Sequence, residues 1–351
     1  MPYAKAPLSP SPPRETRTEV QHFEVSAEEA GQRLDNYVHR RLAGVPRSRI
    51  YRVIRKGEVR VNGRRASPEL RLQVNDRIRI PPVRVLPAGE PARPGARLLE
   101  QMARAIVYED DRLLVLDKPA GLAVHGGSGV SLGVIEALRA LRPRETLELV
   151  HRLDRDTSGC LLVARHTGTL RTLHALMREG GVEKRYLALV KGRWELGAKR
   201  IDVPLRTDTR VGGERTVRPG ASGKPSVSEF RPVEFFGSAA TLMEVTLRTG
   251  RTHQIRVHAQ HTGHAVAGDE KYGDAGFNSE LRERGLARMF LHAHTLSFTW
   301  PQGGDFSINT PLPAELAAVI DTLASQRQGK RHGRRVRAAA APRRAAPPRA
   351  R

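Results

Sequence analysis

The most constraining feature of this chain is a charged segment, residues 150–159, that stands between two apolar runs. Residues 147–150 and 160–164 are mostly aliphatic, which is typical of buried strands. The arginines and carboxylates between them are costly to remove from water unless they pair with one another or work in a functional site. The segment therefore predicts either an ion-pair network or a catalytic group, with Asp154 as the first candidate.

Taken alone, the segment fits an ordinary turn, in which Asp156 or Thr157 bonds to nearby backbone amides. Six further segments favour the catalytic interpretation. They are 114–121 (LVLDKPAG), 125–127 (HGG), 184–190 (KRYLALV), 250–258 (GRTHQIRVH), 268–273 (GDEKYG) and 291–294 (LHAH). With these motifs in this order, the chain resembles the RluA-type pseudouridine synthases over roughly residues 20–325.

The resemblance implies an isomerase that converts uridines of large-subunit (23S) ribosomal RNA to pseudouridine. This reaction involves neither redox chemistry nor net hydrolysis, so we expect no cofactor. A carboxylate can add covalently to sugar or base, or stabilise positive charge on the ribose. The resemblance makes Asp154 the nucleophile, and attack on the ribose and attack on the base both remain open.

A carboxylate in a water-poor cleft needs a cationic neighbour to stay ionised. The resemblance assigns that role to Arg251, whose alternative role is binding a phosphate. It also implies that Tyr186 stacks on the uracil and takes or relays the proton of carbon five. A buried core tyrosine is the alternative for Tyr186.

Three further residues are expected to contact RNA. Arg152 resembles the arginine that fills the space left by a flipped uridine, a step needed because the target is hidden in stacked RNA. His151 belongs to the same motif, and Ile255 is expected to pack against the uracil.

The positive charge of the chain lies in two blocks. The formal net charge is +23, of which residues 31–85 carry +11 and residues 327–351 carry +10. Dedicated basic segments of this kind indicate a polyanionic partner. Most of the basic residues are arginines, which suit bidentate phosphate contacts.

Residues 21–85 resemble a small S4-type (α-L) RNA-binding domain. Residues 33–42 show helical spacing, and a second helix is expected to start near Ser48. Strands are expected at 59–61, 70–74 and 78–80, with a tight turn at Asn62-Gly63. The arginines expected to face RNA are Arg47, Arg49, Arg52, Arg55, Arg60, Arg64 and Arg65. The alternative is a solvated basic domain without a ligand.

The remaining organisation follows from composition. We expect a disordered arm at 1–20, a proline-rich linker at 86–103, a catalytic domain at 104–326 and a disordered basic tail at 327–351. The catalytic domain mixes a strand such as 241–247 with helices at 131–141, 167–179 and 252–262. The fold class is therefore α+β with a mostly antiparallel central sheet, and the resemblance implies a cleft across that sheet.

Cysteine and histidine usage bears on metal binding. Cys160 is the only cysteine, so no internal disulfide is possible, and its apolar surroundings predict a buried thiol. His258, His261 and His264 share a helical face, which makes a zinc hydrolase conceivable. No His-Glu-x-x-His pattern occurs, and the family is metal-free, so we expect no metal.

We expect a cytoplasmic monomer with no membrane span. Two classes of function remain open, an RNA-modifying enzyme and a non-catalytic ribosome-binding or assembly factor on the same scaffold. The complete set of Asp154, Tyr186 and Arg251 favours the enzyme.

Overall fold

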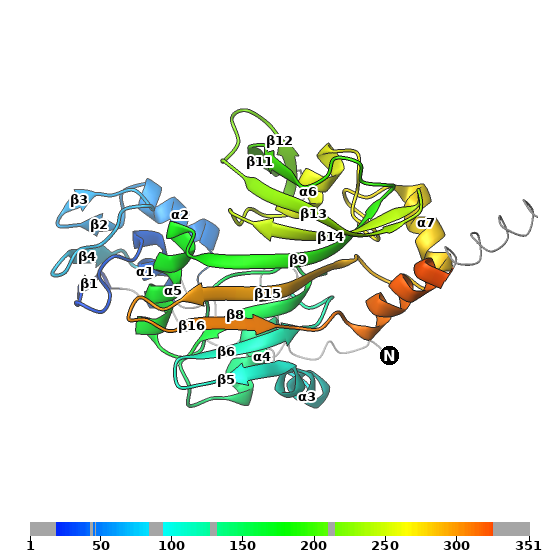
Figure 1. Cartoon of the computed structure of the whole chain (residues 1–351). Helices are drawn as coiled ribbons and strands as arrows, with labels where there is room; N and C mark the ends of the chain where they lie inside the picture. Colours follow the sequence, from blue (N-terminus) through cyan, green and yellow to red (C-terminus); the bar gives the residue numbers. More distant parts are fainter. Residues whose placement is uncertain are drawn as a thin grey trace, which may run out of the picture. The chain divides into compact units, whose positions relative to one another are not determined.

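A computed structural model describes residues 19–42, 45, 47–83, 94–126, 132–209 and 215–325 of the chain. The expected basic tail and nearly all of the expected N-terminal arm lie outside these residues. The chain divides into two compact units, residues 1–92 and 93–351 (Figure 1).

The first unit packs two helices against a small antiparallel sheet. The strand order is β1 (Gln21–Glu24), β4 (Arg77–Ile80), β2 (Arg60–Val61) and β3 (Arg64–Arg65). The helices are α1 (Leu34–Arg41) and α2 (Arg47–Arg55). Their apolar positions are buried in one core with the strands, among them Leu34, Val38, Ile50 and Ile54. Both expected helices are confirmed.

The Asn62-Gly63 turn forms as expected, whereas one expected strand does not. Asn62 and Gly63 both have positive φ, 51° and 75°, which a two-residue hairpin of matching twist requires, and they join β2 to β3. Residues 70–74 contribute only an isolated bridge at Arg71, so the strand predicted there is wrong. Leu72 is buried, but the chain then turns at Asn75 with φ 68°. Strand β1, which the sequence analysis did not identify, pairs with β4 instead.

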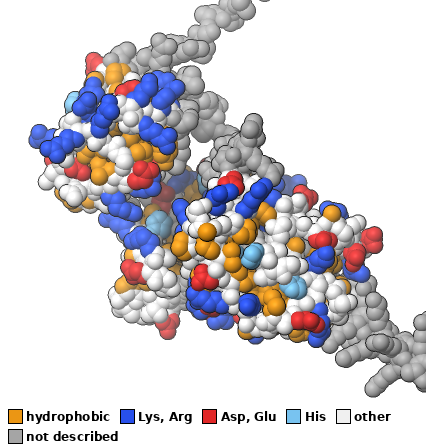
Figure 2. Space-filling model, turned by 90° about the horizontal axis from the view of Figure 1, so that it is seen from above, with side chains coloured by type: hydrophobic (Ala, Val, Ile, Leu, Met, Phe, Trp, Pro, Cys, Tyr) orange, Lys and Arg blue, Asp and Glu red, His pale blue; other side chains and the backbone are white. Residues whose placement is uncertain are grey.

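The basic residues of this unit face solvent. Of the arginines expected to face RNA, those with exposed side chains are Arg49, Arg52, Arg55, Arg60, Arg64 and Arg65. Arg47 lies in α2, but its side chain is outside the described part of the structure. Lysine and arginine side chains gather over this unit at the upper left of Figure 2.

The second unit is built on a ten-stranded sheet. Its main path runs β10-β13-β14-β9-β15-β8-β6-β5, with β16 paired to β15 and β7 paired to β8. The strands are β5 (Ile106–Glu109), β6 (Leu113–Lys118), β7 (Glu148–Leu149), β8 (Ser158–Ala164), β9 (Val182–Lys191), β10 (Lys199–Asp202), β13 (Val227–Phe236), β14 (Ala240–Leu247), β15 (Leu291–Thr299) and β16 (Asp305–Asn309). A separate hairpin joins β11 (Leu205–Thr209) to β12 (Arg215–Pro219).

One pair of this sheet is parallel and the others are antiparallel. The parallel pair joins β8 to β15, with Ser158 opposite His292 and Gly159 opposite Ala293. Gly159 has φ 108°, and a side chain there would collide with the backbone carbonyl of Ala293. The mostly antiparallel sheet is as expected, and the charged 150–157 segment leads directly into its one parallel pair.

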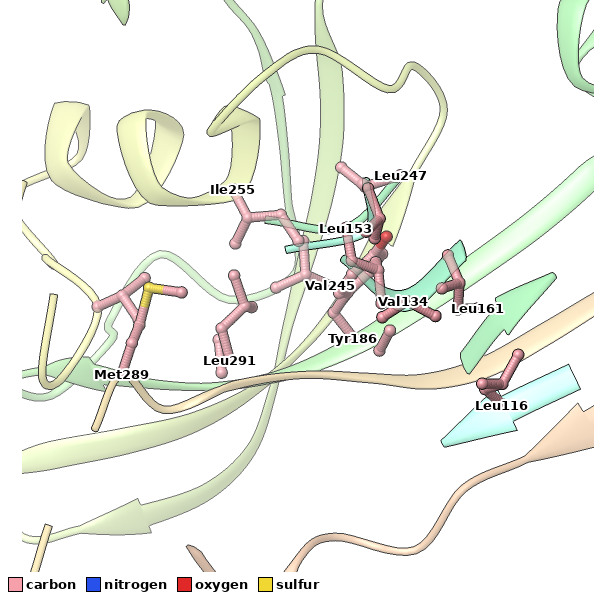
Figure 3. Close-up of a cluster of buried hydrophobic side chains, with 14 of the residues drawn as sticks. Leu116, Val134, Leu153, Leu161, Tyr186, Val245, Leu247, Ile255, Met289 and Leu291 are labelled. Carbon is pink, nitrogen blue, oxygen red and sulfur yellow. The ribbon is translucent and has the colours of Figure 1, made fainter. Parts of the chain in front are cut away.

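Helices cover both faces of the sheet because its central strands alternate between two cores. Leu114 and Leu116 face a core that includes α4 (Val134–Leu141) and α6 (Gln254–His261), part of which Figure 3 shows. Leu113 and Val115 face the other core, against α5 (Thr167–Glu179). A third cluster joins α7 (Ala275–Glu283) to a helix over residues 314–325.

The predicted linker ends earlier than expected. Helix α3 (Ala96–Ala105) begins inside it, and Met102 is fully buried against the second unit's core. Residues 86–93 of the linker are outside the described residues. In the part of the chain that is described, no helix combines the length and the apolar character needed to cross a bilayer.

Candidate active site

A cavity of about 570 Å³ lies where the charged segment meets the start of α6 and the strands β9, β14 and β15. The residues lining it include every catalytic candidate of the sequence, Asp154, Tyr186 and Arg251. Arg152, His151 and Ile255 line it as well. The fold therefore brings together side chains that are up to 104 positions apart, from His151 to Ile255.

The loop that carries Asp154 is held in place by a buried lysine. The ammonium group of Lys118, at the end of β6, donates to the carbonyls of Pro119, Leu122 and Arg155 at 2.7, 2.7 and 3.0 Å. Burial lowers the pKa of Lys118 to about 7, although Asp156 and Asp154 oppose the shift. Lys118 thus ties β6 to the loop one residue after the candidate nucleophile.

The cation beside Asp154 is Arg256, which corrects the expectation for Arg251. Nη1 of Arg256 donates to Oδ2 of Asp154 at 3.3 Å, and its side chain is nearly buried. Arg251 is exposed, and its Nε donates to the carbonyl of Pro225 at 3.1 Å. The two arginines are five residues apart, and only Arg256 lies on α6, whose inner face is turned toward Asp154.

Arg256 is fixed by a second carboxylate. Nε and Nη2 of Arg256 donate to Oδ2 and Oδ1 of Asp269 at 2.7 and 2.8 Å, a bidentate contact. Burial alone would raise the pKa of Asp269, but the hydrogen bonds and charge of Arg256 and two backbone amides lower it. A guanidinium shared by two carboxylates is therefore the electrostatic centre of the site.

Tyr186 forms part of the cavity's apolar wall. Its side chain is 7% exposed and projects from β9 toward Leu153 and Leu247, with Ile255 and Leu291 to one side (Figure 3). Burial and the nearby charge of Asp154 raise the pKa of the Tyr186 hydroxyl, so it is protonated at neutral pH. The ring lies both in the hydrophobic core and at the cavity, so the two interpretations of Tyr186 are compatible.

Of the remaining motif residues, His151 has a structural contact, whereas the side chain of Arg152 is exposed at the cavity. Nε2 of His151 accepts the backbone N–H of Leu162 at 3.1 Å, which ties the segment to β8. Burial and the charge of Lys184 lower the pKa of His151 to about 4. Arg152 is exposed at the cavity, with no hydrogen bond or ion pair to the described residues, and is free to meet a ligand.

Lys184 is a site residue that the sequence analysis did not select. It lines the cavity two positions before Tyr186, on the same face of β9. Burial lowers its pKa, and no hydrogen bond or ion pair reaches it from the described parts of the chain. The sequence did contain a signal for Lys184: it stands two positions before Tyr186 in the segment 184–190, and residues two apart on a strand face the same side.

The three histidines considered for zinc do not converge. His258 contacts the hydroxyl of Ser228 and the carbonyl of Val203, both at 3.0 Å. His264 contacts the carbonyl of Lys191 at 2.8 Å, while His261 is exposed. Among the described residues, no group of three or more His, Cys, Asp or Glu side chains could hold a metal ion.

Comparisons with known proteins agree on one family. Residues 112–261 match the family model of RNA pseudouridylate synthase, and residues 32–78 match that of the S4 domain. The chain is 51% identical over 307 residues to "Ribosomal large subunit pseudouridine synthase C" of Salmonella typhi, covering 86% of this chain and 96% of the relative. The protein of the same name from Escherichia coli K12 is 51% identical over 308 residues, with the same coverage.

Solved structures show the same likeness. Human RNA Pseudouridylate Synthase Domain Containing 4 matches with a TM-score of 0.55 and 25% identity, covering 65% of this chain and 96% of that one. Human RNA Pseudouridylate Synthase Domain Containing 1 matches with a TM-score of 0.51 and 28% identity, covering 64% of this chain and 94% of that one.

We predict that Asp269→Asn destabilises the protein by about 3–5 kcal/mol at pH 7, because it leaves Arg256 buried with half of its carboxylate partners. Asp269 has a lowered pKa, so its contribution is present above the ordinary value of 3.8 and is lost as the pH falls through the lower folded value. Denaturant unfolding of both proteins at several pH values measures the difference, which should shrink in acid.

The matched control is Asp202→Asn, which removes a carboxylate from an exposed pair with Arg200 at 3.6 Å. This change should cost less than about 1 kcal/mol at every pH. If the two substitutions lower the free energy of unfolding equally, the buried pair of Asp269 and Arg256 stabilises the protein no more than an exposed pair does.

Proposed function

The chain belongs to the RluA-type pseudouridine synthases, and from this premise we propose that it isomerises specific uridines of large-subunit ribosomal RNA, with Asp154 as the nucleophile. The observation that carries the proposal is the Asp154 carboxylate, which lies at the cavity against Arg256. A non-catalytic assembly factor would have no need for a paired carboxylate in a cavity of about 570 Å³. The enzyme interpretation is therefore preferred.

The reaction breaks the bond from N1 of the base to C1′ of the ribose and forms a bond from C5 to C1′. N1 gains a proton and C5 loses one, so atoms and electrons balance without a cofactor. A carboxylate at the cavity suits this chemistry, since it can add to the ribose or to the base as the glycosidic bond breaks. The contacts of Arg256 and His253 both reach Oδ2 of Asp154, which leaves Oδ1 as the oxygen that meets the substrate.

The apolar wall of the cavity suits a uracil ring. Tyr186, Leu247, Ile255 and Leu291 offer flat and aliphatic surface on which a flipped base can rest. Because the Tyr186 hydroxyl stays protonated at neutral pH, it begins the reaction as a hydrogen-bond donor. It can then pass the C5 proton on only by releasing its own.

Positive charge around the cavity suits the RNA backbone. The side chains of Arg152, Arg178 and Lys184 line the cavity without a hydrogen bond or ion pair to the described residues. The exposed arginines of the first unit would add sequence-independent affinity, as phosphate contacts do. We propose that the protein acts as a monomer in the cytoplasm, where ribosomal RNA is found.

We predict that Asp154→Asn abolishes pseudouridine formation, by on the order of 10³-fold or more, while RNA affinity stays nearly unchanged. The substitution conserves shape and removes the nucleophile. Single-turnover assays and filter binding with the same ribosomal RNA fragment measure the two quantities. Asp111→Asn, at a side chain that is 87% exposed, is the control and should keep the wild-type rate. Product formation within tenfold of wild type in Asp154→Asn would refute the assignment.

We predict that replacing four arginines of the first unit by glutamine lowers the slope of log affinity against log salt, by about 0.7–0.9 for each phosphate that the protein no longer neutralises. The four are Arg52, Arg55, Arg60 and Arg64. The measurement is a salt titration of RNA binding. Modification of a saturating RNA should continue at the same uridines.

A control variant that loses the same charge elsewhere distinguishes RNA binding by the first unit from an effect of the protein's net charge. It carries glutamine at four exposed basic positions of the second unit, Arg97, Arg104, Lys199 and Arg282. Its salt slope should stay close to wild type. If both variants change the slope equally, the first unit does not bind the RNA backbone.

A further inference from the structure

His253 has an unusual backbone conformation at the edge of the site. Its φ and ψ are 54° and 21°, in the left-handed region, at the residue immediately before α6. The other two non-glycine residues with positive φ in the described chain are asparagines, Asn62 and Asn75. Such a conformation persists only where surrounding contacts determine it. The contacts of the imidazole explain what holds His253 there.

The phenol of Tyr272 fixes one side of the imidazole. The Tyr272 oxygen accepts the backbone N–H of Val217, on β12, at 2.9 Å. The same oxygen lies 2.8 Å from Nδ1 of His253. A phenol has one hydrogen, and Nδ1 is the one acceptor that the described structure offers it, so we assign Tyr272 as the donor and Nδ1 as the acceptor. With this assignment, the proton of the neutral ring is on Nε2.

The opposite side of the imidazole faces the nucleophile. Nε2 of His253 lies 3.9 Å from Oδ2 of Asp154, the oxygen that also accepts from Arg256 at 3.3 Å. A distance of 3.9 Å is longer than a hydrogen bond, and contacts of this kind often shorten when substrate fills a site. Both groups therefore lie against Oδ2, and no hydrogen bond or ion pair reaches Oδ1 from the described residues.

We propose that His253 is a positioning residue for the pseudouridine synthase reaction, whose Nε2–H, fixed by Tyr272, orients Asp154 so that Oδ1 meets the substrate. The inference rests on the proposed role of Asp154. It adds a chain of contacts from Val217 through Tyr272 and His253 to the nucleophile, so that the hairpin of β11 and β12 helps to set the carboxylate's orientation.

The charged groups around the ring determine what happens as the pH changes. Burial lowers the pKa of His253; Arg256 and Lys271 act in the same direction, while Asp154 and Asp269 oppose them. Above that pKa, Nε2 carries a proton only in the tautomer that Tyr272 selects. Below it, both nitrogens carry protons, and the donor toward Asp154 is present whatever Tyr272 does.

The first test is His253→Asn. Asparagine tolerates the left-handed backbone and can accept from Tyr272, but its side chain is too short to reach Asp154. We expect the single-turnover rate at saturating RNA to fall 10-fold to 100-fold, with the dissociation constant for RNA within threefold of wild type. His261→Asn, at an exposed histidine at the end of α6, is the control and should keep the wild-type rate. A His253→Asn rate within threefold of wild type overturns the inference.

The second test is Tyr272→Phe. This variant keeps the imidazole of His253 but removes the hydroxyl that donates to Nδ1, so the neutral ring can carry its proton on either nitrogen. We expect its rate deficit relative to wild type to grow as the pH is raised through the pKa of His253. A purely structural role for Tyr272 predicts the same deficit at every pH, and that result overturns the inference. If Asp154→Asn proves active, the proposed function fails. If Asp154→Asn is inactive while His253→Asn is fully active, only the role of His253 is refuted.

Discussion

The site depends on one buried guanidinium. Arg256 forms a bidentate contact with Asp269 and uses its remaining nitrogen to reach Asp154, so one side chain joins two carboxylates that are 115 positions apart. Removing such a cation from water is costly unless its hydrogen bonds are satisfied. Asp269 satisfies most of them independently of substrate. Arg256 is therefore rigid before RNA arrives, and Asp154 meets a preorganised positive charge.

The sheet supplies the rest of that rigidity. The Asp154 loop leads into β8, which pairs with β15 in the one parallel ladder of the sheet. Gly159 allows this close approach, because any side chain there would meet the backbone of Ala293. Lys118 donates to the carbonyl of Arg155 in this loop and to the carbonyls of Pro119 and Leu122, and so ties the loop to the segment that follows β6. The proposed nucleophile thus lies on a short loop between β7, which is half-buried, and β8, which is fully buried, and precise sites are built on such rigid elements.

Much of this could be predicted from the sequence, and the errors have physical reasons. Helical spacing identified α1, and the charged segment between apolar runs located Asp154. Arg251 was preferred to Arg256 because a motif gives position along the chain but not the direction of a side chain. Arg256 stands between Ile255 and Val257, both buried, and a cation in such a run signals a buried ion pair.

The strand expected at 70–74 failed because only Leu72 of its alternating residues is buried, while Leu70 and Val74 are exposed. The predicted linker extended too far toward the C-terminus because prolines up to Pro94 obscured the helical spacing that begins at Ala96.

The most direct test of the central role of Arg256 compares Arg256→Lys with Arg251→Lys in single-turnover assays at saturating RNA. A lysine keeps the charge but has a single nitrogen, so it cannot make the bidentate contact with Asp269 and reach Asp154 from separate nitrogens as Arg256 does. Arg256→Lys should therefore lose at least tenfold in rate and Arg251→Lys less than threefold. A wild-type rate for Arg256→Lys would contradict the account.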